Sequence, residues 1–233
     1  MVKNHLSRLN APKSWPIRRK GIKFIAKPSP GPHSMRECIG LGLAVKELFR
    51  LARTTKEVKS VLNEKNILVN GIVRKDYKFP LGIMDIIAVP SLGKNFILLY
   101  NKKGKFIIQE LKKGKENTRL CKIAEKTSVK GNKVQLNLTD GTNILLDKNT
   151  YSVGDTLVID LKAKKVASCA KLEKGARVYV TGGKKVGMVG IIDEIKKLQG
   201  KRGHNVIIDV EGKKVETAKD YIFVIGDTEI KNE

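Results

Sequence analysis

The chain has 233 residues, 41% of them hydrophobic, and carries 47 Lys and Arg against 23 Asp and Glu, a formal net charge of +24. A body this positive repels itself, so its natural counterpart is a polyanion, nucleic acid before anionic membrane. The hydrophobic content allows buried cores, which excludes a wholly disordered chain, and the absence of an apolar run of about 18 residues predicts no membrane span.

The cysteines and histidines predict neither disulfides nor a metal site. Cys38, Cys121 and Cys169 are far apart in sequence and odd in number, which favours free thiols in a reducing compartment. The three histidines are widely spaced, and none lies near a Cys or carboxylate in a ligand pattern. The basic N-terminus lacks the apolar stretch of a secretory signal. We therefore expect a cytoplasmic protein with no cofactor and no metal.

Residues 1–41 predict an extended basic segment. They hold nine Lys and Arg, one acidic residue and five of the seven prolines of the chain. Proline fixes its own φ and biases the preceding residue toward extended geometry. A disordered tail is the alternative, but such tails are poor in Trp, Phe and Ile, and this segment is not. We expect it to become ordered against RNA.

The stretch "KSWPIRRKGIKF" (13–24) places Arg18, Arg19 and Lys20 between Trp15 and Phe24. Basic groups interleaved with aromatic rings suit RNA phosphates and stacked bases. The alternative is that Trp15 packs within the chain on the next domain.

Residues 42–90 predict a small α+β module. Apolar spacing of three and four residues predicts a helix over 40–53, and a second helix is expected to begin at Thr54, because Glu57 three residues later completes a capping box. Two strands follow around Asn70-Gly71, a pair that suits the positive φ angles of a type I′ hairpin turn. A further strand is expected in "IMDIIAV" (83–89).

The rest of the chain predicts two β domains. Residues 91–171 hold short β-rich runs such as "KVQLNL" and "DTLVIDL", separated by turn signals, which favours a small antiparallel barrel. Residues 172–233 repeat this style around the Gly-rich "TGGKKVGMVG". The lysine-rich "NKKGK" and "LKKGKE" (101–105 and 111–116) contact phosphates on this interpretation; ordinary solvated loops are the alternative.

No pattern indicates catalysis. "GGKKVG" (182–187) fails the P-loop pattern because Met188 follows Gly187 where Lys is required, and "GLGLAV" (40–45) lacks the third glycine of a dinucleotide fingerprint. Asp193 and Glu194 point to opposite sides of a strand, which disfavours an acid–base pair. A catalytic site assembled from distant residues stays open as an alternative.

Several motifs together resemble one family. "HLSRLNAPKSWPIRRK" with "PSPGPHS" resembles the opening of the S-four-e family of small-subunit ribosomal proteins from archaea and eukaryotes. "RTTKEVKSVLNEKNILVNGIVRKDYKFPLGIMDII" is similar to its RNA-binding module, with Asn66 where many such modules carry Gly. "KGARVYVTGGKKVGMVGIIDEI" resembles a KOW motif, and the resemblance covers essentially the whole chain, with an archaeal source favoured.

The resemblance implies a mainly β, multi-domain protein. Its expected parts are an extended segment (1–41), a helix–hairpin RNA-binding module (42–90), a central antiparallel β-barrel (91–171) and a KOW-containing, SH3-like barrel (172–233). It implies a structural component of the ribosomal small subunit that binds ribosomal RNA and neighbouring ribosomal proteins, with no catalytic residue, membrane or small-molecule substrate. Deleting residues 1–40 is then expected to leave the other domains folded and to weaken ribosome incorporation.

The expected RNA contacts are basic, aromatic or helix-capping residues of the segment, the module and two loops. They are Lys3, His5, Arg8, Lys13, Trp15, Arg18, Arg19, Lys20, Lys23, His33, Arg53, Thr54, Thr55, Lys56, Lys59, Arg74, Lys75, Lys102, Lys103, Lys184 and Lys185. Thr54 and Thr55 are expected to offer backbone N–H groups to a phosphate at the helix start.

Other classes of protein compete with this interpretation. A non-ribosomal RNA-binding assembly or translation factor would use the same modules. An RNA-modifying enzyme would need a further catalytic domain, for which no residues remain. A membrane-bound basic protein lacks a strongly amphipathic basic helix, and a DNA-packing role fits the charge but not the extended segment.

Overall fold

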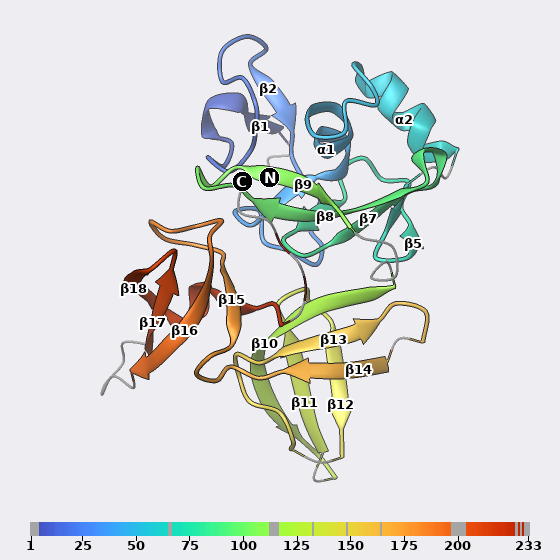
Figure 1. The fold of residues 1–233 in the computed structure, drawn as a ribbon. Coiled ribbons are helices and arrows are strands. Elements are labelled where there is room, and N and C mark those ends of the chain that lie inside the picture. Colours follow the sequence, from blue (N-terminus) through green and yellow to red (C-terminus); the bar gives the residue numbers. More distant parts are fainter. Residues whose placement is uncertain are drawn as a thin grey trace. The chain divides into compact units, whose positions relative to one another are not determined.

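The structure, a computed structural model, describes residues 5–64, 67–111, 117–131, 133–147, 149–163, 165–196, 204–226, 228 and 230. Within these ranges the chain forms two compact units, one from residues 1–100 with 105–119 and one from residues 101–104 with 120–233. Both consist mainly of antiparallel strands, and the first also contains two α-helices (Figure 1). No helix in the described ranges is long and apolar enough to cross a membrane. The expected mainly β protein with a small α+β part is confirmed.

The N-terminal segment folds onto the first unit instead of remaining extended. Strand β1 (His5–Ser7) pairs with β2 (Phe24–Ala26), and the 3-10 turn η1 (Arg8–Asn10) follows β1. Its apolar side chains enter the core: Leu6, Ala11, Trp15 and Ile17 are buried. The structure therefore argues against the expectation that residues 1–40 can be deleted without harm to the remaining fold.

Two short helices follow the N-terminal segment. Strand β3 (Cys38–Gly40), which pairs with β6 (Pro80–Gly82), leads directly into α1 (Leu41–Glu47). The helix is half as long as the 40–53 expected, because the chain turns out of it: Arg50 has a φ of 55°, in the left-handed region. Helix α2 (Thr55–Asn63) begins at its Thr54 cap, as the sequence predicted, and buries Val58 and Leu62.

The main sheet of the first unit has the strand order β5-β4-β7-β8-β9. It contains β4 (Leu68–Val69), β5 (Ile72–Val73), β7 (Ile86–Val89), β8 (Lys94–Tyr100) and β9 (Phe106–Glu110), with the 3-10 turn η2 (Pro90–Leu92) between β7 and β8. Asn70 and Gly71 have φ angles of 51° and 76°, as the predicted hairpin turn requires. The expected domain boundary at residue 91 is wrong in this respect, since β8 and β9 extend the sheet of the first unit.

In the second unit, five strands form an antiparallel sheet with the order β12-β11-β10-β13-β14. They are β10 (Thr118–Val129), whose first two residues belong to the first unit, β11 (Lys133–Leu138), β12 (Asn143–Leu146), β13 (Thr156–Asp160) and β14 (Lys165–Ala170). Cys121, Ile123, Leu136, Leu138 and Leu157 form its core. Among the described strands, β12 and β14 are the two edges of this sheet. The sheet is therefore open, whereas the sequence predicted a closed barrel.

A second five-stranded antiparallel sheet has the order β18-β17-β16-β15-β19. It contains β15 (Arg177–Val180), β16 (Val189–Lys196), β17 (Asn205–Val210), β18 (Lys213–Ala218) and β19 (Ile222–Val224), with the 3-10 turn η3 (Lys219–Tyr221) before β19. Val178, Val180, Ile192, Val206 and Ile208 are among its buried core residues. The Gly-rich loop 181–188 joins β15 to β16.

A buried lysine connects the two sheets of the second unit. Lys122 of β10 is 9% exposed, and its Nζ donates to the backbone carbonyl oxygens of Asp220 at 2.8 Å and Lys219 at 3.2 Å. Burial lowers the pKa of Lys122 from 10.5 to about 8. Between these two pH values the unfolded chain binds more protons than the folded one, so this group makes stability rise with pH.

Replacing Lys122 by Met should remove that pH dependence. The free energy of unfolding of the wild type relative to the variant should rise by about 1–2 kcal/mol between pH 8 and 9.5. Urea unfolding followed by the NMR signal of the Met188 methyl group, which packs against the C-terminal core, measures this difference. If the free energy of unfolding of the two proteins changed in parallel with pH, Lys122 would not be the source of this pH dependence.

Candidate nucleic-acid interface

The start of α2 is capped by its own side chains. Thr54 Oγ1 accepts from the Glu57 backbone N–H at 3.2 Å, while Glu57 Oε2 accepts from the Arg53 N–H at 2.8 Å and from the Thr54 N–H at 3.4 Å. The backbone hydrogen bond from Arg53 and the hydrogen bond from Thr54 lower the pKa of Glu57. A carboxylate thus occupies the position where a phosphate was expected, so the prediction that Thr54 offers a free N–H group is wrong. Arg53, Lys56 and Lys59 remain exposed around this end.

Two arginines of the N-terminal segment support its fold. Arg19 donates from Nη1 to the carbonyl oxygen of Ala11 at 2.6 Å and from Nη2 to that of Pro12 at 2.8 Å. Arg8 donates to the carbonyl oxygen of Arg18 at 3.0 Å. The acceptors in these hydrogen bonds are backbone carbonyl oxygens, so both guanidinium groups still contribute positive charge to this surface.

A groove of about 240 Å³ separates β2 from the two helices. Its lining includes Phe24 and Ile25 of β2, Lys46 and Glu47 of α1, Thr55 and Val58 of α2, together with Arg8, Ile22 and Tyr77. Ile22 and Phe24 are 76% and 47% exposed, although both are large and apolar. The structure therefore brings the N-terminal segment and the helical module, which sequence reasoning treated as separate contacts, to one groove.

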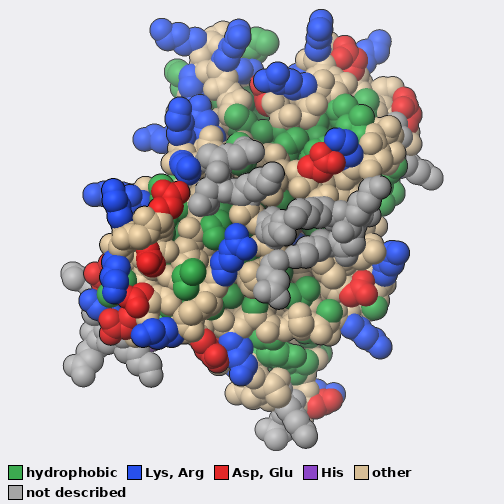
Figure 2. All heavy atoms as spheres, viewed as in Figure 1, with side chains coloured by type: hydrophobic (Ala, Val, Ile, Leu, Met, Phe, Trp, Pro, Cys, Tyr) green, Lys and Arg blue, Asp and Glu red, His purple; other side chains and the backbone are tan. Residues whose placement is uncertain are grey.

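Cations lie over the aromatic rings along this groove. Lys59 Nζ is 5.1 Å and Lys78 Nζ 5.7 Å from the centroid of the Tyr77 ring. Lys23 Nζ is 5.4 Å from the Phe24 ring, against which His5 packs edge-on at 5.2 Å. Figure 2 shows Lys and Arg gathered around β1 and β2, whereas acidic residues mix with them around α1 and α2 and around β16 to β18.

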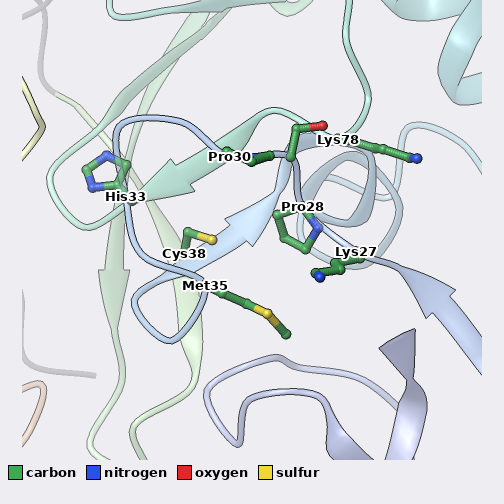
Figure 3. Close-up of a pocket in the computed structure, with 8 residues that line it drawn as sticks. Lys27, Pro28, Pro30, His33, Met35, Cys38 and Lys78 are labelled. Atoms are coloured by element: carbon green, nitrogen blue, oxygen red, sulfur yellow. The ribbon is translucent and has the colours of Figure 1, made fainter. Parts of the chain in front are cut away.

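A second hollow, of about 250 Å³, lies beside the loop that follows β2. Pro28, Pro30, Met35 and Cys38 give it apolar walls, and Figure 3 shows His33 at one end with Lys27 and Lys78 at the other. Burial raises the pKa of Cys38 to about 11, so its thiol is protonated at neutral pH. The hollow is smaller than the roughly 300–1,000 Å³ of typical small-molecule sites.

Asp85 is the centre of a buried polar cluster next to that loop. It is 1% exposed and accepts from Arg119 Nη2 at 2.7 Å, Asn70 Nδ2 at 2.9 Å and the Gly82 N–H at 2.8 Å, with His33 Nε2 at 3.0 Å. Burial alone would raise the pKa of Asp85, but the hydrogen bond with His33 and the charge of Arg119 outweigh burial and lower it to about 2. The cluster joins the N-terminal loop to the sheet of the first unit.

Two predicted RNA contacts have structural roles instead. Trp15 is 1% exposed, and its Nε1 donates to the carbonyl oxygen of Cys38 at 2.7 Å. It cannot stack on a base from this position, and the alternative that it packs within the chain is correct. The His33 side chain is 9% exposed and pairs with Asp85, so it is also removed from the surface.

The other predicted residues differ in exposure. Arg8, Arg19, Arg74 and Lys185 are partly buried, and the guanidinium of Arg74 lies 4.4 Å from the Phe79 ring. Exposed are His5, Lys13, Arg18, Lys20, Lys23, Arg53, Thr54, Thr55, Lys56, Lys59, Lys75, Lys102, Lys103 and Lys184. Lys3, Asn66 and residues 112–116 lie outside the described residues.

Sequence reasoning did not include Lys46, Lys78 or Tyr77 among the contacts. Lys46 and Tyr77 line the groove because α1, β2 and the loop before β6 pack together, and Lys78 lies next to the Tyr77 ring; no local sequence pattern predicts this arrangement. The three-residue run "DYK" (76–78), an aromatic between charged residues, was the available signal. Among the described residues, no three His, Cys, Asp or Glu side chains gather to hold a metal ion.

A basic, mainly β fold whose groove combines aromatic rings with nearby lysines is typical of nucleic-acid-binding proteins. Residues 92–166 match the Ribosomal family S4e, and residues 2–36 match the RS4NT (NUC023) domain. The chain belongs to the ribosomal protein family S4e, whose members are structural proteins of the ribosome and not enzymes.

The similarity extends over nearly the whole chain. The small ribosomal subunit protein eS4 of Archaeoglobus fulgidus is 41% identical over 226 residues, 97% of this chain and 94% of the relative. The protein of the same name from Methanosphaera stadtmanae is 39% identical over 224 residues, 96% and 92% of the two chains. The crystal structure of the 30S ribosomal protein S4e from Thermoplasma acidophilum has a TM-score of 0.71 and 25% identity, covering 82% of this chain and 95% of that one.

Proposed function

We propose that this chain is a structural component of the small ribosomal subunit and that it binds small-subunit ribosomal RNA through the groove of its first unit. The observation that supports this most directly is a set of cations around apolar and aromatic side chains that are exposed (Ile22, Phe24) or partly exposed (Tyr77). These cations are Arg8, Lys23, Lys46, Lys59 and Lys78. Phosphates would lie on the cations, while an unpaired base or ribose would lie on the apolar floor.

We propose further that the second unit contributes to RNA binding and that the chain has protein partners. Residues 172–233 would act as a KOW-containing, SH3-like module, with the Gly-rich loop 181–188 carrying Lys184 and Lys185 to RNA. Neighbouring ribosomal proteins are the proposed protein partners, and the cytoplasmic ribosome is the proposed site of action. Binding of this kind supports assembly of the subunit and, through it, translation.

Removing four groove cations should weaken RNA binding through its electrostatic part. In a variant with Lys23, Lys46, Lys59 and Lys78 changed to Ala, the slope of log affinity against log salt should fall by about one for each lysine that contacts a phosphate. The measurement is binding of the full chain to small-subunit ribosomal RNA between about 50 and 200 mM salt.

Four lysines in the sheet of β10 to β14 and its turns allow a charge-matched control. Lys130, Lys133, Lys162 and Lys165 are exposed, and changing these four to Ala alters the net charge equally. If the control variant reduced the slope of log affinity against log salt as much as the groove variant, binding would depend only on total charge. That result would contradict the proposal that the groove binds RNA. Recovery of one wild-type copy per salt-washed small subunit would distinguish a ribosomal component from a transient assembly factor.

A further inference from the structure

Tyr221 lies on a glycine pair of the Gly-rich loop. A Cβ atom added to Gly182 would be 2.6 Å from the Tyr221 Cδ1, and one added to Gly183 would be 3.6 Å from Cδ2. One face of the ring therefore rests directly on the backbone of the loop. Only a residue without a side chain at position 182 allows this close approach.

Backbone contacts hold Tyr221 in this position. Its carbonyl oxygen accepts from the Thr181 N–H at 2.8 Å and from Thr181 Oγ1 at 3.0 Å. The two preceding carbonyl oxygens, those of Lys219 and Asp220, accept from the buried Nζ of Lys122. The short turn η3 is thus attached on both sides, so the ring has a fixed orientation before any ligand arrives.

The Tyr221 ring does not belong to the hydrophobic core, unlike the aromatic rings near it. Tyr179 and Phe223, the aromatic residues of the neighbouring strands β15 and β19, are 1% and 6% exposed, whereas Tyr221 is 46% exposed. Since one face is covered by glycines, the exposed area belongs to the rest of the ring. A half-exposed, rigidly held aromatic ring is the geometry that stacks on an unpaired nucleobase.

The charge next to the ring suits a nucleotide. Lys184 is exposed and Lys185 partly exposed in the same loop, whereas the side chain of Lys219, two residues before the ring, packs against Gly154. Asp220 is an exposed acidic residue in this turn, so the two loop cations accompany one anion. A phosphate bound by Lys184 or Lys185 would leave its base within reach of the aromatic face.

We infer that Tyr221 is a stacking platform for one unpaired base of single-stranded RNA, with the loop lysines binding the adjacent phosphates. This deepens the proposed RNA-binding function and rests on it. The site is separate from the groove: it lies in the C-terminal sheet, and the sequence pattern of the loop alone identifies its lysines but not the ring that η3 places against it.

The test compares a single-stranded oligoadenylate with an abasic ribose-phosphate oligomer of equal length and charge. Both are bound to the full chain that carries the four groove substitutions, so that the groove contributes little. Tyr221→Ala should weaken oligoadenylate binding about 5- to 150-fold, the equivalent of stacking one base, and leave binding of the abasic oligomer unchanged. The salt slope should stay the same, because no phosphate contact is removed.

Further variants separate stacking from loop structure. Tyr221→Leu keeps apolar packing on the glycines but has no aromatic face, so it should lose affinity as Tyr221→Ala does, whereas Tyr221→Trp should retain or increase it. Changing Lys184 and Lys185 to Ala should instead lower the salt slope for both oligomers. Equal loss on both oligomers, or no loss with Tyr221→Ala, would overturn the inference. Retained binding of the wild-type chain to ribosomal RNA would in that case leave the proposed function standing.

Discussion

Replacing Asp85 by Asn should lower the free energy of unfolding of the first unit by about 3–5 kcal/mol. The substitution removes a buried carboxylate that pairs with Arg119, whose side chain is only 10% exposed, and that also accepts from the Gly82 N–H, so a buried ion pair is broken by the loss of one partner. Urea unfolding followed by the fluorescence of Trp15, the sole tryptophan of the chain, reports on this unit alone.

Two controls test the role of the Asp85 charge. Exchanging Arg119 for Met together with Asp85→Asn should recover part of the loss, because an apolar side chain then takes the place of the buried guanidinium that faced the carboxylate. Acid titration is the second control: the pKa of Asp85 falls from 3.8 to about 2 on folding. Its contribution of about 2 kcal/mol is therefore present above pH 4 and is lost as the pH falls toward 2. If Asp85→Asn showed the same acid dependence as the wild type, another carboxylate would be responsible.

Replacing Trp15 by Ala should cost the first unit about 3–5 kcal/mol. The change removes a large, fully buried side chain and the hydrogen bond to the Cys38 carbonyl oxygen. Trp15→Phe should cost less, since it retains most of the packing and loses chiefly the hydrogen bond. Circular dichroism measures unfolding of both variants, and limited proteolysis measures release of residues 5–30.

The same substitution should affect RNA binding indirectly. Once Trp15 no longer holds the N-terminal segment, Arg8 and Phe24, with Lys23 over its ring, lose their fixed place in the groove. We expect Trp15→Ala to weaken binding to small-subunit ribosomal RNA even at temperatures where the rest of the first unit is folded. Unchanged stability and unchanged protection from protease would show that the segment does not depend on this side chain.

Local chemistry made some elements predictable from the sequence. The capping box of α2 and the Asn70-Gly71 turn depend on residues three or fewer positions apart, and both are confirmed. The end of α1 was not predictable from its apolar spacing, because Arg50 adopts a positive φ that the sequence does not require. The boundary near residue 91 failed because pairing of β7 with β8 is a property of the sheet, not of the turn between them.

In the candidate interface, too, the sequence predicted some residues and missed others. Charge and composition predicted RNA contacts in the N-terminal segment and at the start of α2, and many of the lysines and arginines there are exposed. Composition could not separate a tryptophan that contacts RNA from one that fills a core, since both occur among prolines and basic residues. Nor could it identify Tyr77 and Tyr221, whose surroundings arise from packing between distant segments.

The folded N-terminal hairpin also has a kinetic consequence. A segment that is disordered when free must search for its bound conformation on the RNA, and association then includes a folding step. Here β1 and β2 are already paired and Trp15 is already in place, so the first unit docks as a preformed surface. Its association rate should therefore be governed by diffusion and long-range attraction, falling with added salt. During assembly of the small subunit, this unit would therefore bind its RNA without a folding step of the N-terminal segment.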